Sequence, residues 1–143
     1  MADAQSLGAQ FIDAFNAHDE ERIRSLNAES VVFEAPGDVH LEGREAATQY
    51  AMEWLNAFPD ARINVHQEIA AGDWVVQEFS FEGTHTAPMH GPTGEIPATH
   101  RSLNGRGVQI FKVEGDVVVD TRLYFDQVQV MTQLGLMPEP ATA

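Results

Sequence analysis

The hydrophobic pattern of this sequence changes its period once, near residue 60. Before that point, apolar residues recur at the spacing of an amphipathic helix, as Leu7, Phe11 and Phe15 do. After it, apolar and polar residues alternate, as they do in the stretch 61–70, and alternation is typical of strands. Helices gathered early and strands gathered late predict an α+β domain.

Capping and turn residues divide the chain further. The expected helices cover 3–17, 20–26 and 44–57, and a short helix or an extended edge follows at 127–136. The expected strands cover 31–35, 39–42, 61–70, 74–86, 100–113 and 117–125, with a proline-rich loop at 88–97. We expect the four long strands to form a meander within a curved antiparallel sheet. Wrapped around the N-terminal helices as a cone, this sheet leaves an apolar pocket between its concave face and the helices.

Size and charge narrow the class of protein. The 143 residues predict one domain over 1–143, with its core at about 6–136. A net charge of −14 disfavours nucleic acid and anionic membranes as partners. The absence of cysteine, of a long apolar run and of a basic, apolar leader at the N-terminus favours a cytoplasmic location.

Several kinds of catalytic and binding motif are missing from the sequence. It holds no paired histidines at metal-ligand spacing, no Ser-His-Asp arrangement, no phosphate loop and no dinucleotide fingerprint. We therefore expect neither a metal nor another cofactor, and a small apolar molecule as the partner.

Short motifs along the chain carry a family resemblance. They are Gly43-Arg44-Glu45-Ala46, Phe58-Pro59-Asp60, Gly72-Asp73-Trp74-Val75-Val76, Gly83-Thr84-His85-Thr86, Pro92-Thr93-Gly94, Tyr124-Phe125-Asp126 and Gln133-Leu134-Gly135. In this order and spacing the chain resembles the SnoaL-like polyketide cyclases, which have the nuclear transport factor 2-like fold. The resemblance implies that fold, a homodimer, and an enzyme that moves protons next to a carbonyl group.

The same resemblance implies one catalytic residue. Asp126 stands seven residues before Gln133, where cyclases of this family have an aspartate that acts as general acid and base. Leu123 stands where the similar limonene epoxide hydrolase has an essential aspartate, so epoxide hydrolysis by that mechanism is disfavoured.

The spacing of residues places two other polar side chains on the same strand face as Asp126. Arg122, Tyr124 and Asp126 are two residues apart and share one face of a strand. If that face lines the pocket, burial raises the pKa of the carboxyl group, and the tyrosine can donate a hydrogen bond to an enolate oxygen. The alternative is that Arg122 and Asp126 form a solvated pair on the outside of the sheet.

Other candidate site residues come from their phase and position. His85 is in phase with apolar residues of its strand and is a second catalytic candidate, and His100 is expected near it across the proline-rich loop. Glu34 is expected to face the pocket from an early strand. The pocket wall is predicted to include three aromatic residues: Phe15, Tyr50 and Trp54.

These observations favour a cofactor-free acid/base enzyme that acts on a small apolar carbonyl compound, with intramolecular aldol cyclisation as the reaction that the resemblance implies. Isomerisation or dehydration, as in ketosteroid-isomerase-like enzymes, would use the same proton chemistry. A protein that binds a small ligand without turnover is the alternative of another class. All of these functions need the same apolar pocket, so the position of acidic and basic groups relative to it decides among them.

Overall fold

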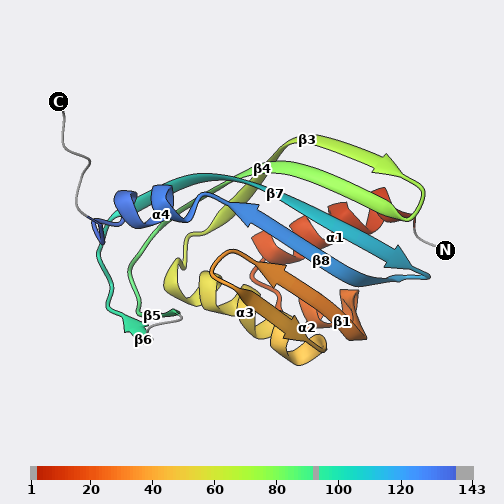
Figure 1. The fold of residues 1–143 in the computed structure, drawn as a ribbon, viewed down its shortest axis with the longest axis horizontal. Helices are drawn as coiled ribbons and strands as arrows, with labels where there is room; N and C mark the ends of the chain where they lie inside the picture. Colours follow the sequence, from red (N-terminus) through yellow and green to blue (C-terminus); the bar gives the residue numbers. More distant parts are fainter. Residues whose placement is uncertain (1–2, 92–93, 138–143) are drawn as a thin grey trace.

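The computed structural model describes residues 3–91 and 94–137 (Figure 1). The helices are α1 (Ala4–Asn16), α2 (Glu20–Leu26), α3 (Arg44–Ala57) and α4 (Gln127–Gln133). The strands are β1 (Asn27–Ala35), β2 (Val39–Glu42), β3 (Arg62–Ala71), β4 (Trp74–Thr84), β5 (Met89–Gly91), β6 (Gly94–Ile96), β7 (Ser102–Glu114) and β8 (Val117–Phe125). The α+β prediction and the meander of long strands are confirmed. The expected loop at 88–97 contains the short β5–β6 pair, and residues 92 and 93 lie outside the described residues.

The first two helices begin at aspartate caps. The Asp3 side chain accepts a hydrogen bond from the Ser6 backbone N–H at 2.8 Å, and Asp19 accepts one from that of Arg22 at 3.1 Å. Each cap satisfies a helix N–H that has no partner within the helix.

The main sheet has the strand order β2-β1-β8-β7-β4-β3. All neighbours are antiparallel except β1 and β8, which pair in parallel, so the expectation of a purely antiparallel sheet is wrong at one position. These two strands are separated by most of the chain. Their connection therefore imposes none of the antiparallel geometry that a hairpin turn requires.

Helices α1 and α3 cover one face of the sheet, as Figure 1 shows. The Phe11 ring lies 5.2 Å from that of Phe111 on β7, and Phe15 lies 6.3 Å from Phe81 on β4 (between ring centroids). On β7, alternate residues from Leu103 to Val113 are buried. The concave face of the sheet and the helices therefore share one core, which contains a cluster of aromatic rings.

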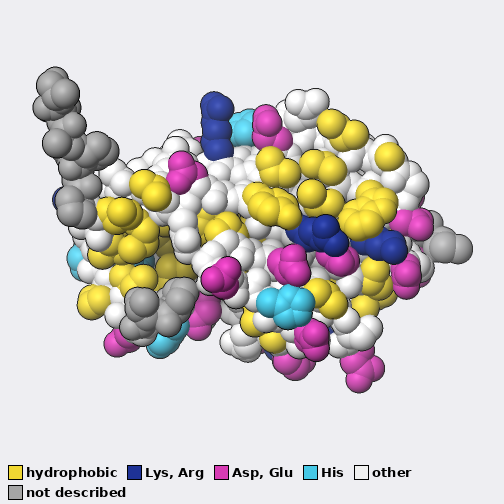
Figure 2. Space-filling model, viewed as in Figure 1, with side chains coloured by type: hydrophobic (Ala, Val, Ile, Leu, Met, Phe, Trp, Pro, Cys, Tyr) yellow, Lys and Arg dark blue, Asp and Glu magenta, His cyan; other side chains and the backbone are white. Residues whose placement is uncertain are grey.

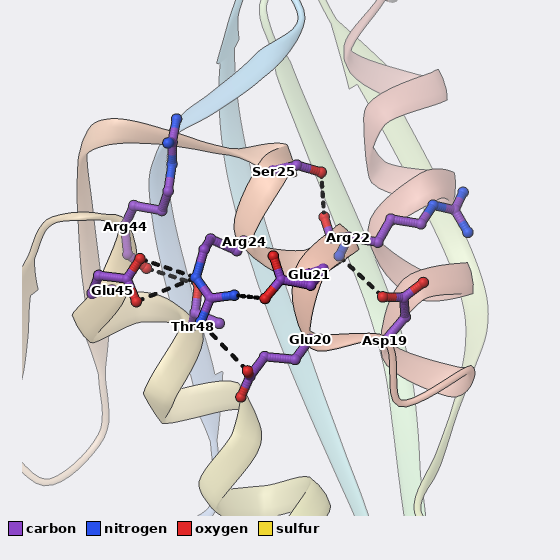
Figure 3. A network of polar contacts seen from close by, with 9 residues as sticks. All are labelled: Asp19, Glu20, Glu21, Arg22, Arg24, Ser25, Arg44, Glu45 and Thr48. Atoms are coloured by element: carbon purple, nitrogen blue, oxygen red, sulfur yellow. Dashed lines mark hydrogen bonds and ion pairs between the residues drawn. The ribbon is translucent and has the colours of Figure 1, made fainter.

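An ion-pair network ties α2 to α3 (Figure 3). The Arg24 Nε donates to both carboxylate oxygens of Glu45, at 3.0 and 3.2 Å, and its other nitrogens contact Glu20 and Glu21. In addition, Arg44 Nε donates to the backbone oxygen of Asn27 at 2.9 Å. The network thereby holds the junction of α2 and β1, where Asn27 lies, against the start of α3.

Side chains of helix α4 cover the edge of β7 beyond the point where β8 ends. The amide of Gln133 exchanges two hydrogen bonds with the backbone of Asn104, at 2.7 and 3.0 Å, and Gln129 Oε1 accepts from the Arg106 N–H at 3.4 Å. These two side chains occupy the hydrogen-bonding edge of β7 beyond its last pair with β8. Gln133, from the motif that carries the resemblance, is therefore a structural residue here.

The outer face of the sheet carries exposed apolar side chains. Figure 2 shows hydrophobic groups gathered over β3, β4 and β7 beside Lys and Arg side chains. Ile69, Trp74 and Tyr124 are exposed, and the Lys112 ammonium lies 5.7 Å from the centre of the Trp74 ring. The homodimer implied by the resemblance stays a prediction, and such a contact would cover these side chains.

Candidate functional site

A cavity lies between the concave face of the sheet and helices α1 and α3. Its volume is about 80 Å³, on a scale where one water molecule needs about 10–15 Å³. That space suits a compact molecule of one ring. Aromatic side chains from both layers are the largest group in its wall: Phe11, Phe15, Phe33, Tyr50, Trp54, Phe79, Phe81 and Phe125.

Few polar residues line this cavity. They are Asn27, Tyr50, Arg106, Gln109 and Thr121. Among the residues that the structure describes, no Asp, Glu or His belongs to the lining. The described residues of the wall therefore offer hydroxyl, amide and guanidinium groups to a ligand, but neither a carboxylate nor an imidazole.

Tyr50 is the titratable phenol in this apolar setting. It projects from α3, and its ring centroid lies 4.6 Å from that of Phe33. Burial raises the pKa of the Tyr50 phenol, and a hydrogen bond with Trp54 lowers that pKa by less. The indole N–H can only donate, so the phenol oxygen accepts it and keeps its own proton to donate. Tyr50 is thus a neutral hydrogen-bond donor inside the cavity.

Phe15, Tyr50 and Trp54, which the sequence analysis assigned to the pocket wall, all line the cavity. For the face of β8 that carries Arg122, Tyr124 and Asp126, the structure decides for the outside of the sheet and against the pocket. Arg122, Tyr124 and Asp126 are exposed, whereas Thr121, Leu123 and Phe125 point inward. The alternation itself held the signal, because apolar Leu123 and Phe125 alternate with polar Arg122 and Tyr124.

Asp126 has a structural task at the end of β8. Its carboxylate accepts a hydrogen bond from the Gln129 N–H at 3.1 Å and caps α4. Arg122 pairs with Asp120 at 3.4 Å rather than with Asp126. The carboxylate of Asp126 lies outside the cavity lining, although its chain neighbour Phe125 is part of it.

Glu34 is also outside the cavity. It is exposed on β1, and His40 Nδ1 lies 3.2 Å from its carboxylate. Phe33 occupies the inward position instead. The early strand thus contributes an aromatic ring to the wall, and the prediction that Glu34 faces the pocket is wrong.

His85 is fully buried but separate from the cavity. Its ring stacks on Phe58 with centroids 5.1 Å apart, and it is absent from the cavity lining. His100 lies near His85, as expected, and its backbone nitrogen is 2.8 Å from the His85 backbone oxygen. The His100 side chain, however, is exposed and is not part of the cavity lining. The Thr99 N–H donates to His85 Nδ1 at 3.2 Å, so the ring proton is on Nε2. Nε2 has no hydrogen-bond partner among the described residues.

This burial makes stability depend on pH. Desolvation lowers the pKa of His85 below 6.5, His100 lowers it further, and the backbone of Ala87 raises it by less. The unfolded chain therefore binds the proton more tightly. The contribution of His85 to stability is complete above about pH 6.5 and is lost as the pH falls through the lower folded pKa.

We expect His85→Gln to flatten the fall in unfolding free energy between pH 7 and pH 5, measured by urea denaturation. The exposed His90 provides the control, because His90→Gln should leave that slope as in the wild type. An unchanged slope in His85→Gln would contradict this origin of the pH dependence.

Two residues that the sequence analysis missed lie in the sheet beside the cavity. Gln77 and Gln109 are buried on neighbouring strands, and Gln109 lines the cavity. Both occur in phase with buried apolar residues, Gln77 between Val75 and Phe79 on β4. A glutamine at a position where the alternation predicts a buried apolar residue was the sequence signal for these two residues.

Comparisons with known proteins identify the family of this chain. The family model of the SnoaL-like polyketide cyclases matches residues 6–134. The chain therefore belongs to this family. No curated protein matches the sequence significantly.

Solved structures show where this SnoaL-like fold recurs. A protein from Jannaschia sp. CCS1, assigned to the SnoaL-like polyketide cyclases, has a TM-score of 0.82 at 20% identity, over 94% of this chain and 93% of that one. IdmH from Streptomyces antibioticus, assigned as a polyketide cyclase, has a TM-score of 0.78 at 24% identity over 94% and 99%. A protein of ketosteroid isomerase-like fold from Catenulispora acidiphila has a TM-score of 0.75 at 14% identity over 95% and 97%. At these identities the likeness shows the fold alone.

Two further observations concern metal binding and membrane-spanning helices. No three described His, Asp or Glu side chains come together as metal ligands would. None of the described helices has the length and apolar character needed to cross a bilayer. The cytoplasmic location stays a prediction.

Proposed function

We propose that this SnoaL-like protein takes a small, largely apolar carbonyl compound into its cavity and promotes proton transfer next to the carbonyl group. Intramolecular aldol cyclisation is the reaction of this kind that the family suggests. The observation that supports the proposal best is a protonated phenol, Tyr50, in a cavity walled by aromatic rings.

Tyr50 would hydrogen-bond the carbonyl oxygen of the ligand. When a proton leaves the neighbouring carbon, charge develops on that oxygen as an enolate forms. A donor held in an apolar site stabilises such charge more than water does, because the site has a low dielectric constant and needs no reorganisation. The raised pKa of the Tyr50 phenol keeps it in its donating form.

Asp126 is the proposed proton acceptor. It follows directly on Phe125, whose ring lines the cavity and lies 5.6 Å from that of Trp54. A substrate that extends past Phe125 toward the start of α4 would reach the exposed carboxylate. Proton transfer by Asp126 therefore requires a substrate longer than the ring that fills the cavity.

A second candidate function is binding without turnover. It is favoured by the lack of any described Asp, Glu or His in the cavity lining. A binding protein would use the same aromatic wall and the same phenol, so affinity alone does not separate the two functions. Turnover does.

The role of Tyr50 is tested by Tyr50→Phe, which removes only the hydroxyl group. We expect the affinity for acetophenone to fall about tenfold, the value of one hydrogen bond, and the affinity for ethylbenzene to stay the same. Both affinities are measurable by ligand-observed NMR titration. Equal affinity of wild type and variant for acetophenone would refute the proposed contact.

A further inference from the structure

Three polar side chains form a continuous row across the concave face of the sheet. Glu68 on β3, Gln77 on β4 and Gln109 on β7 are direct neighbours in the strand register. Gln77 Nε2 donates to Glu68 Oε2 at 2.8 Å, and Gln109 Nε2 donates to Gln77 Oε1 at 3.0 Å. Gln77 has no exposed surface and Gln109 has 5%. The row runs from half-buried Glu68 to the cavity wall.

The carboxylate at one end gives this row a direction. A carboxylate accepts hydrogen bonds and cannot donate them, so Gln77 must turn its nitrogen toward Glu68. Its oxygen then faces Gln109, which must in turn use its own nitrogen for that contact. The Gln109 oxygen is left over, and it accepts no hydrogen bond from the described residues. Glu68 thus determines which atom of Gln109 is free to serve a ligand.

Helix α1 packs closely over this row. Helix α1 has Gly8 over Gln77, and a Cβ atom at Gly8 would lie 2.8 Å from Gln77 Nε2. A glycine within a helix costs stability relative to alanine, and a buried amide costs stability unless it is hydrogen-bonded. The close approach of α1 keeps the Gln77 amide away from water, so its hydrogen bonds to Glu68 and Gln109 are the ones available to it, and the row ends at an unused acceptor in the cavity.

A second amide of the cavity is held in the same way. Asn27 Nδ2 donates to the Ile23 oxygen at 3.1 Å, while Arg44 fixes the backbone of Asn27. The side-chain oxygen of Asn27 accepts no hydrogen bond from the residues in the described ranges. Both amides of the lining thus use a nitrogen for structure and keep an oxygen free.

We propose that the cavity selects ligands with a hydroxyl group, whose O–H donates to Gln109 Oε1, and that Glu68 sets this preference from outside the cavity as a positioning residue. The proposal rests on the proposed function and narrows its substrate class to hydroxylated ring compounds that also carry a carbonyl group. The hydroxyl group meets the acceptor on β7, and the carbonyl oxygen meets the Tyr50 donor on α3.

The experiment compares phenol with anisole, in which a methyl group replaces the hydroxyl proton. We expect the wild type to bind phenol about tenfold more tightly than anisole in ligand-observed NMR titrations. Gln109→Leu should bring the ratio of the two affinities to about one, because the acceptor is lost. Since the NMR titration reports each affinity separately, a general loss of binding is distinguishable from a change in preference.

Glu68→Lys tests the direction of the row. A lysine ammonium only donates, so Gln77 would turn its oxygen outward, and Gln109 would present its nitrogen to the cavity. We expect the ratio to fall to one or below, with anisole still bound. Glu78→Lys, an equal charge change at an exposed position of β4, should keep the wild-type ratio. If Glu68→Lys fails to fold, Glu68→Gln, which permits either direction, should still move the ratio toward one.

The outcomes separate this proposal from the one on which it rests. Equal binding of phenol and anisole by the wild type, or a wild-type ratio in Glu68→Lys, would overturn the hydroxyl preference while leaving the cavity as a binding site. A wild-type protein that binds neither phenol, anisole nor ethylbenzene would overturn both proposals. An intact ratio together with an ineffective Tyr50→Phe would overturn only the carbonyl contact.

Discussion

We expect Asp126→Asn to slow proton transfer next to a carbonyl group by roughly 100-fold or more without unfolding the protein. The amide keeps the size of the side chain but cannot take up the proton. Asparagine is as good a helix cap as aspartate, so the hydrogen bond from the Gln129 N–H and the start of α4 should persist. Binding of acetophenone in the cavity should therefore stay close to that of the wild type.

Proton transfer can be followed without the natural substrate. In D₂O, exchange of the methyl protons of 4-phenylbutan-2-one, a ketone whose side chain extends beyond the ring, is visible by proton NMR, and the rate with protein is compared with the rate in buffer. Asp73→Asn, the same charge change in the β3–β4 turn, is the matched control and should keep the wild-type rate. If the wild type binds 4-phenylbutan-2-one but does not speed the exchange, the binding function is favoured. An Asp126→Asn variant with the full wild-type rate would exclude Asp126 as the base.

The largest expected effect on stability belongs to Phe58→Ala. Phe58 is completely buried. It stacks on the rings of His85 and Trp54 and meets that of Phe81 edge-on, with centroid distances from 5.1 to 5.9 Å. Removing a ring from such a site destabilises a protein by about 3–5 kcal/mol, because contacts are lost and a void remains. For a chain of this size, the melting temperature should fall by about 10 °C.

Calorimetry and urea denaturation measure this loss. Val128→Ala on α4 is the control, since this side chain is 57% exposed and its removal should change stability by less than about 0.5 kcal/mol. The void should also admit water to the His85 ring, which would bring its pKa closer to 6.5 and weaken the pH dependence of stability. A loss of less than about 1 kcal/mol would show that the surrounding rings close the gap.

Local patterns in the sequence were sufficient for most elements. Asp19 followed by Glu20 and Glu21 predicted the start of α2, and the alternation on either side of Gly115-Asp116 predicted the β7–β8 hairpin. The aromatic stripes of α1 and α3 likewise predicted the residues Phe15, Tyr50 and Trp54 of the cavity wall. Capping, turn formation and amphipathic spacing depend on residues close in the chain, so the sequence alone determined them.

The tertiary structure decided which face of each strand meets the core. Spacing placed Arg122, Tyr124 and Asp126 on one face of β8, but only packing against α3 turned Leu123 and Phe125 inward and left Asp126 to cap α4. In the same way, the parallel pairing of β1 with β8 and the row from Glu68 to Gln109 join segments far apart in the sequence. A periodicity of two defines two faces, and the apolar residues favour one of them for burial, but the segments that cover this face arrive from elsewhere in the chain.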